Sequence, residues 1–102
     1  MPTVRVMSDY HCFPLWSRDS GNNLGPDDLP LSGGLVDGLR AWAGAYDATL
    51  NEEYPPDSGF ASEEEERAFV AQGLDLARRV ATELGPGYTV EYFDGSSATT
   101  VS

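Results

Sequence analysis

The sequence predicts an α+β fold of the order β-α-α-β, in which a two-helix hairpin packs on a small antiparallel sheet. Two observations predict it. Apolar side chains recur at helical spacing over residues 32–51 and 62–84, and β-forming side chains alternate at 3–10 and 88–93. A helix pair between two strands reverses the chain, so the simplest layout makes the strands adjacent and antiparallel. The length of 102 residues predicts one domain, 1–102.

The first strand is predicted over residues 3–10, where Val4 and Val6 fall on one face and Arg5 on the other. Residues 11–31 are rich in Gly, Pro and Asn and form a loop that is longer than usual in a compact domain. Two strands alone are marginally stable. We therefore expect that this loop adds a third strand, or that a sheet edge pairs with another chain.

The first helix is predicted to begin at Ser32, a favourable N-cap residue, and to end near Leu50 or Asn51. Several glycines weaken it, so it depends on packing through one apolar stripe. The stripe consists of Leu35, Leu39, Trp42, Tyr46 and Leu50.

The second helix is predicted over residues 62–84. Ser62 and Glu65 have the spacing of a capping box, and Gly85-Pro86-Gly87 is a stop signal. Its buried stripe consists of Phe69, Gly73, Leu76, Val80 and Leu84.

The second strand, residues 88–93, carries Glu91, which we predict to be a cross-strand partner of Arg5. Residues 94–102 are small and polar, which predicts a flexible, frayed tail.

Charge limits the choice of partners. The chain has 17 acidic and 6 basic residues, and a formal net charge of -11. This charge disfavours nucleic acid and anionic membranes and favours a basic protein partner. A single cysteine, Cys12, excludes an internal disulfide, and no apolar run approaches the length of a membrane span. The N-terminus lacks the apolar core of a signal peptide, so we expect a cytoplasmic protein.

The segment around Cys12 offers one catalytic hypothesis, a small enzyme that uses Asp9, His11 and Cys12. Its spacing argues against a nucleophile–base pair, because neighbours on an extended chain point to opposite faces. The alternative makes Cys12 a small buried filler and His11 a structural hydrogen-bonding group.

The sequence predicts no metal and no cofactor. One His and one Cys fall short of a zinc site, and the Asp27-Asp28 pair lacks the spacing of a calcium loop. Gly33-Gly34 precedes a helix but lacks the Lys-Ser/Thr ending of a phosphate-binding loop.

Two loops combine acids, aromatics and prolines, as protein interfaces do. The alternative is a solvated acidic surface whose aromatic side chains fold inward onto the core, namely Phe13, Trp16 and Phe60. The predicted partner-binding residues are Trp16, Asp19, Asp27, Asp28, Glu52, Glu53, Tyr54, Asp57 and Phe60.

Several segments resemble a group of small acidic proteins from high-GC bacteria. They are Asp9-Tyr10-His11-Cys12-Phe13-Pro14-Leu15-Trp16, Asp28-Leu29-Pro30-Leu31-Ser32, Trp42-Ala43, Tyr46-Asp47, Thr49-Leu50-Asn51, Ser58-Gly59-Phe60 and Glu91-Tyr92. The resemblance covers nearly the whole chain. In size and charge such proteins are similar to the immunity proteins that neutralise secreted toxins.

The resemblance and the charge together lead us to expect a cytoplasmic immunity protein or antitoxin rather than an enzyme. It would bind a basic toxin, such as a nuclease, and occlude its active site, with Trp16, Tyr54 or Phe60 as an anchor. One alternative is the small enzyme described above. The other is a self-associating structural or regulatory domain that forms a homodimer through a strand edge.

Overall fold

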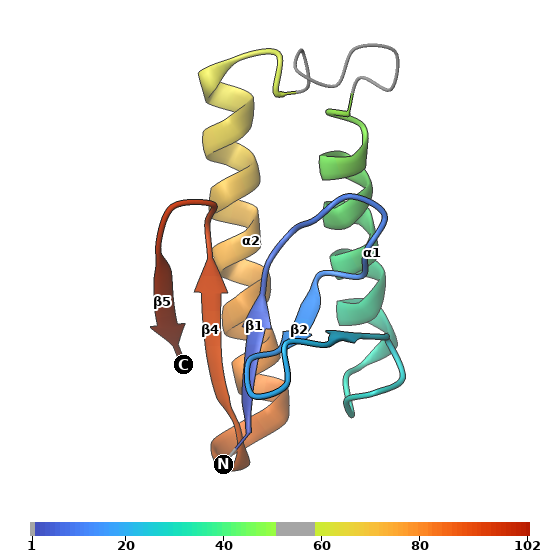
Figure 1. Cartoon of the computed structure of the whole chain (residues 1–102), viewed down its shortest axis with the longest axis vertical. Helices are drawn as coiled ribbons and strands as arrows, with labels where there is room; N and C mark the ends of the chain where they lie inside the picture. Colours follow the sequence, from blue (N-terminus) through green and yellow to red (C-terminus); the bar gives the residue numbers. More distant parts are fainter. Residues whose placement is uncertain (1, 51–58) are drawn as a thin grey trace.

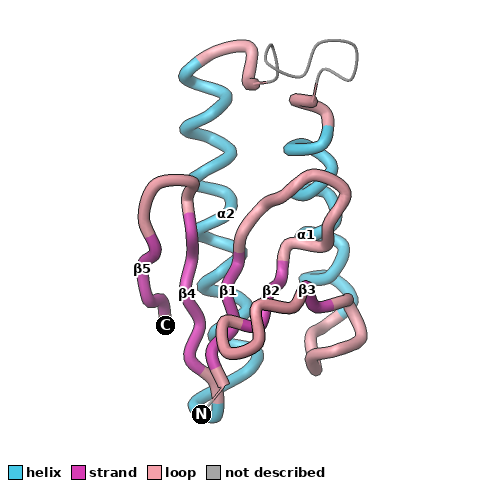
Figure 2. Tube along the Cα trace, viewed as in Figure 1, coloured by secondary structure: helices cyan, strands magenta, loops and turns pink. Residues whose placement is uncertain are grey.

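The computed structural model describes residues 2–50 and 59–102. It confirms the α+β class, because two helices pack on each other and on one face of a mixed sheet (Figures 1 and 2). In chain order the elements are β1 (Thr3–Val6), β2 (Leu15–Ser17), β3 (Asn23–Leu24), α1 (Gly33–Asp47), α2 (Glu63–Leu84), the short 3-10 helix η2 (Gly85–Gly87), β4 (Thr89–Phe93) and β5 (Ala98–Val101).

The five strands lie in the order β3-β2-β1-β4-β5. The predicted adjacency of β1 and β4 is confirmed, but the predicted antiparallel direction is wrong, since these two strands are parallel. The reason is the hairpin of β1 and β2. Because β2 brings the chain back to the start of β1, α1 runs in the direction of β1 (Figure 1). After α2 has returned the chain once more, β4 enters parallel to β1.

The long loop is the source of the extra strands. Residues 11–31 contain both β2 and β3, which pair with each other through Leu15–Leu24 and Trp16–Asn23. The first of the two expected solutions, a further strand within the loop, is therefore the one that the chain adopts.

The end of the chain corrects the prediction of a frayed tail over residues 94–102. Residues 98–101 form β5, which pairs antiparallel with β4. Asp94 closes the turn that leads to β5, because its carboxylate accepts hydrogen bonds from the backbone N–H groups of Ser96 and Ser97, both at 2.9 Å.

Both helices begin at the predicted caps. The hydroxyl oxygens of Ser32 and Ser62 accept hydrogen bonds from the backbone N–H groups of Leu35 and Glu65. Helix α2 ends as predicted, at Gly85, whose φ of 74° lies in the left-handed region.

Helix α1 ends earlier than predicted, at Asp47 rather than near Leu50 or Asn51. The N–H groups of Thr49 and Leu50 bond to carbonyls only three residues back, at 3.0 Å each. These are turn bonds and not helical ones, so the chain leaves the helix at Asp47.

The core lies between the sheet and the helix pair, and both predicted stripes supply it. Trp42 of α1 is 1% exposed, and its indole N–H donates to the Phe69 carbonyl oxygen at 2.9 Å. Its ring stacks on Phe69, with centroids 4.6 Å apart. The buried cluster comprises Val4, Val6, Leu15, Leu35, Leu39, Trp42, Phe69, Leu76, Ala77, Val80, Val90 and Tyr92.

Gly73 of α2 lies where Trp42 and Tyr92 meet the helix. The Tyr92 hydroxyl donates a hydrogen bond to the Val70 carbonyl oxygen at 3.0 Å, one helical turn from Gly73. Only a residue without a Cβ permits two large rings to approach α2 so closely.

Candidate functional site

The outer face of the sheet, which is the face opposite the two described helices, carries a row of large side chains. Strand alternation directs Val90 and Tyr92 inward, so Glu91 points outward. Register then places Arg5 between Trp16 on β2 and Glu91 on β4. We call Trp16, Arg5, Glu91 and Phe93 the outer-face row.

Glu91 holds this row together. Its Oε1 atom lies 2.7 Å from Nε of Arg5 and 3.2 Å from Nε of Arg18. The predicted Arg5–Glu91 pair is therefore confirmed. The Arg5 guanidinium also lies 5.1 Å from the centroid of the Phe93 ring, within the range of a cation–π contact. These contacts fix Arg5 in one position on an otherwise acidic protein.

Trp16 lies at one end of the row. It is half-buried, and its indole N–H donates to the Met7 carbonyl oxygen at 3.0 Å. Its orientation is therefore set, while part of the ring remains accessible. Asp19, one turn beyond β2, is exposed and accepts a hydrogen bond from the Thr3 N–H at 3.2 Å.

Asp27 and Asp28 are exposed in the loop that follows β3, the strand paired with that of Trp16. Asp28 accepts a hydrogen bond from the Gly25 N–H at 2.6 Å, which shapes this loop. Trp16, Asp19 and this aspartate pair thus belong to the part of the fold built by β1, β2 and β3.

Phe60 lies elsewhere and is half-buried, with its ring centroid 5.0 Å from that of Phe69. Phe13 is also half-buried against the core. Both rings therefore pack toward the core, as the inward-folding alternative predicts. The other predicted residues of the second loop, Glu52, Glu53, Tyr54 and Asp57, lie outside the described residues.

The Asp9–Cys12 segment has the contacts of a tight turn. His11 is exposed, has a φ of 60°, and donates its backbone N–H to the Asp47 carboxylate at 2.9 Å. The Asp9 carboxylate accepts from the Tyr10 N–H at 2.8 Å. Cys12 is half-buried, in partial agreement with its role as a filler. The acidic groups here stabilise the turn of the backbone.

Within residues 2–50 and 59–102, no three side chains of His, Cys, Asp or Glu come together as metal ligands would. Neither of the two helices in this part of the chain has the length and apolar character needed to cross a membrane.

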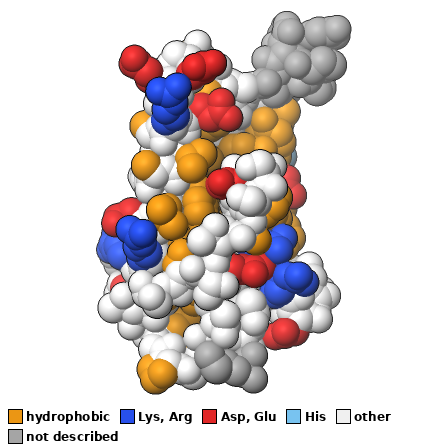
Figure 3. Space-filling model, turned by 90° about the vertical axis from the view of Figure 1, so that its left-hand side faces the viewer, with side chains coloured by type: hydrophobic (Ala, Val, Ile, Leu, Met, Phe, Trp, Pro, Cys, Tyr) orange, Lys and Arg blue, Asp and Glu red, His pale blue; other side chains and the backbone are white. Residues whose placement is uncertain are grey.

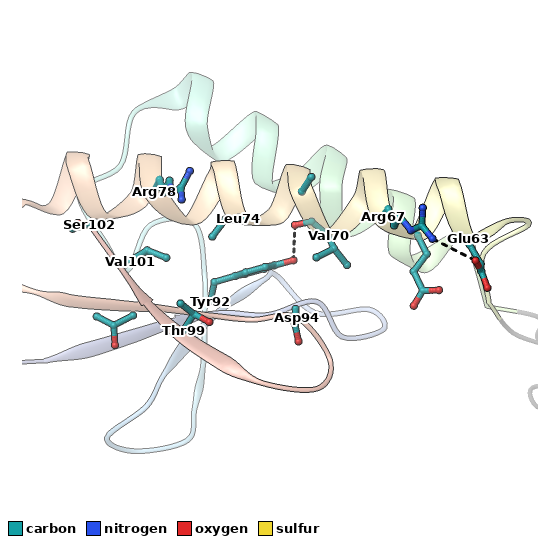
Figure 4. Close-up of a pocket in the computed structure, with 13 residues that line it drawn as sticks. Glu63, Arg67, Val70, Leu74, Arg78, Tyr92, Asp94, Thr99, Val101 and Ser102 are labelled. Carbon is teal, nitrogen blue, oxygen red and sulfur yellow. Dashed lines mark hydrogen bonds and ion pairs between the residues drawn. The ribbon is translucent and has the colours of Figure 1, made fainter.

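Sequence reasoning missed a groove between α2 and β5, which has a volume of about 900 Å³ (Figures 3 and 4). Val70 and Leu74 of α2 and Tyr92 and Val101 of the sheet line its apolar middle. We call this the α2–β5 groove. Figure 3 shows hydrophobic side chains in the centre of one side of the molecule, with acidic and basic side chains at its top. No local signal identified this groove, because it depends on β5, whose polar composition resembles that of a flexible tail.

Charged side chains occupy the two ends of the α2–β5 groove. Glu63 and Glu66 lie in the first turn of α2, and Arg78 lies toward the other end of the groove. Asp94 lies on the sheet side, at the turn between β4 and β5 (Figure 4). Arg67, which also lines the groove, pairs with Glu63 at 3.6 Å. Backbone N–H groups of Ser97 and Ser96 lower the pKa of Asp94, so it is charged at neutral pH.

Tyr92 separates the groove from the core. Burial raises the pKa of its hydroxyl to about 12, and the nearby Asp94 charge acts in the same direction. The hydroxyl therefore stays protonated and continues to donate to the Val70 carbonyl oxygen across the physiological range.

Comparison with known proteins gave one family. The family model described as Serratia CdiI immunity protein-like matches residues 2–95. The matched range includes both helices and β1 to β4, and β5 follows it. A comparison with curated proteins gave no match.

Proposed function

Since the chain belongs to the Serratia CdiI immunity protein-like family, we propose that it neutralises a basic toxin by covering the toxin's active site with the outer face of its sheet. Members of this family are toxin inhibitors and not enzymes, which excludes the small-enzyme alternative. The chain accordingly has a toxin-binding immunity role. What we propose in addition is which surface of the chain contacts the toxin and what kind of toxin the chain binds.

The observation that carries the proposal is the outer-face row. Trp and Arg are the residue types that most often dominate binding energy at protein interfaces. Trp16 is oriented by its hydrogen bond to Met7, and Arg5 by its ion pair with Glu91. Side chains that are already fixed lose little conformational entropy on binding. The row therefore supports a pre-organised contact at this face.

Acidic residues supply the second part of the proposal. Asp19, Asp27 and Asp28 are exposed in the loops next to Trp16, and the chain as a whole carries a charge of -11. Such a field steers a cationic partner and speeds its association. A nuclease fits, because an active site that binds phosphates is cationic. We also propose that binding occurs in the cytoplasm, where a nuclease would meet its substrate.

The second loop provides a further proposed contact. Glu52, Glu53, Tyr54 and Asp57 remain candidates on the strength of their acidic and aromatic composition. Phe60 remains one as well, although its packing on Phe69 leaves only part of the ring available to a toxin.

The direct test is the affinity for the cognate toxin. A Trp16→Ala variant is expected to bind about 30-fold more weakly, equivalent to about 2 kcal/mol, because it removes the largest side chain of the outer-face row. Calorimetric titration of the purified pair measures this loss. Gln72→Ala, an exposed position on α2, is the control and should bind like the wild type. Equal affinities of the Trp16→Ala variant and the wild type would reject this face as the contact.

Asp27 tests the role of charge. Asp27→Asn is expected to lower the association rate about twofold and to weaken its dependence on salt, because an exposed charge near a contact acts on steering. Asp37→Asn, on α1, makes the same charge change at another exposed position and should have a smaller effect. Stopped-flow measurements at several salt concentrations compare the association rates of the two variants. A larger effect for Asp37→Asn would place the toxin on the helical side.

Self-association through a sheet edge is a second candidate function. It is favoured by β5, which ends the sheet beside an open groove.

A further inference from the structure

The outer face of the sheet carries a local excess of positive charge. Arg5 and Arg18 pair with the same oxygen of Glu91, which lies 2.7 Å and 3.2 Å from their Nε atoms. Among the described residues, neither guanidinium forms an ion pair with any other carboxylate. Two cations therefore share one anion, so this group is cationic on a chain whose formal net charge is -11.

Arg18 is the member of this group that reaches solvent. Its side chain is 58% exposed, compared with 24% for Arg5 and 15% for Glu91. Backbone pairing holds Arg18 beside β1, because its N–H donates to the Thr3 carbonyl oxygen at 2.9 Å. The ion pair with Glu91 is made at Nε of Arg18, so the terminal N–H groups of this guanidinium are available to a partner.

The acidic residue next to Arg18 in the chain does not neutralise it. The Asp19 carboxylate accepts a hydrogen bond from the Thr3 N–H at 3.2 Å, and in the described part of the chain it pairs with no arginine. A protein that covers this face would therefore take Arg18 out of water while this chain supplies no further counter-charge. Enclosing an uncompensated charge, or placing it against a like charge, is strongly unfavourable. The covering protein has to supply the anion.

We propose that Arg18 binds an acidic side chain of the toxin, which lies opposite it within an otherwise cationic surface. This inference rests on the proposed function, because it takes the outer face of the sheet as the contact. The N–H groups of a guanidinium match the two oxygens of a carboxylate, so the contact is specific as well as favourable. Active sites that act on phosphates commonly include a carboxylate, as a metal ligand or as a general base. Arg18 thereby discriminates between the cognate toxin and a surface that is cationic throughout.

The direction of the effect on binding separates these two kinds of surface. Arg18→Gln makes an already acidic chain more acidic. Opposite a surface that is cationic throughout, this change would strengthen binding. Opposite a carboxylate, it leaves that carboxylate without its partner, and we expect binding to weaken about 30-fold. The loss should appear in the dissociation rate, because the added negative charge can only assist the approach of a cationic toxin.

The test is surface plasmon resonance of the full chain with the cognate toxin, which gives both rates. Arg18→Lys keeps the charge but loses the paired N–H groups, so it should bind about fivefold more weakly than the wild type. Arg79→Gln is the matched control, since it makes the same change at an exposed arginine of α2 and should keep the wild-type dissociation rate. Both arginines are exposed, so folding should be preserved, and circular dichroism verifies it.

Faster dissociation of Arg18→Gln, with Arg79→Gln unchanged, supports the inference. An Arg18→Gln variant that dissociates like the wild type or more slowly overturns it, as does an equal loss of binding in Arg79→Gln. Trp16→Ala then shows how far the failure extends. If Trp16→Ala still weakens binding, the outer face remains the contact and only the carboxylate opposite Arg18 is rejected. If Trp16→Ala also binds like the wild type, the outer face is rejected with it.

Discussion

A Trp42→Ala variant is expected to lose about 4 kcal/mol of unfolding free energy, because large aromatic side chains cost about 3–5 kcal/mol when removed from a core. Trp42 is 1% exposed and joins α1 to both α2 and the sheet. Its ring stacks on Phe69, and its indole N–H donates to the Phe69 carbonyl oxygen. A domain of this size is stable by about 5–15 kcal/mol, so the variant should be close to unfolding. Urea denaturation followed by circular dichroism measures the change.

Trp16→Ala is the matched control, since it removes the same side chain from a half-buried position. It should cost far less stability than Trp42→Ala. Trp42→Phe keeps an aromatic ring but loses the hydrogen bond to Phe69, and it should fall between the wild type and Trp42→Ala. Equal losses of unfolding free energy in Trp16→Ala and Trp42→Ala would show that the core is not centred on Trp42.

Gly73→Ala is expected to destabilise the fold by about 3 kcal/mol, although alanine is the better helix former. A Cβ at position 73 would lie 2.8 Å from Cε1 of Tyr92, and it would also clash with the Trp42 ring and the Tyr92 hydroxyl. Neither ring can move freely, because Trp42 is bonded to Phe69 and Tyr92 to Val70. Chemical denaturation of the wild type and the Gly73→Ala variant measures the difference in their unfolding free energies.

Gly44→Ala, in the neighbouring helix, is expected to change stability in the opposite direction. Nothing lies within 4 Å of a Cβ built at Gly44, which is exposed on α1. Here only helix propensity changes, so alanine should stabilise the protein by about 0.5–1 kcal/mol. If Gly73→Ala also stabilised the fold, the close approach of the two rings to α2 would be wrong.

The helices were largely predictable because their signals are local. Ser32 and Ser62 cap them, Gly85 ends α2, and the apolar spacing identifies residues such as Leu39 and Val80 that the structure buries. Each of these features depends on neighbours within about one or two turns, which a single sequence displays directly.

The sheet was predictable only in part, because pairing depends on distant residues. Strands β2 and β3 have three and two residues, too few for alternation to identify them. Missing this hairpin led directly to the wrong direction for β4. Strand β5 is rich in threonine and follows a polar turn, so its composition resembles that of a tail. Its order comes from pairing with β4, which the sequence of β5 alone does not encode.

The candidate site, like the sheet, was predictable from the sequence only in part. The acidic charge and the Trp16–Asp19 region were visible as residue types, and the Arg5–Glu91 pair followed from strand alternation. The ion pair of Arg18 with Glu91 and the contact of Phe93 with Arg5 arise only through folding, which brings these side chains together. The α2–β5 groove was missed because it requires β5 to be a strand.

The central claim, that the toxin binds the outer face of the sheet, can be tested with the two tryptophans of the chain. In a ¹⁵N-labelled sample, each indole N–H gives its own NMR signal, assigned with Trp16→Phe. We expect that adding unlabelled toxin shifts or broadens the Trp16 signal beside the toxin, while the enclosed Trp42 signal stays nearly unchanged. If saturating toxin leaves the Trp16 signal where it was, the outer face is not the toxin-binding surface.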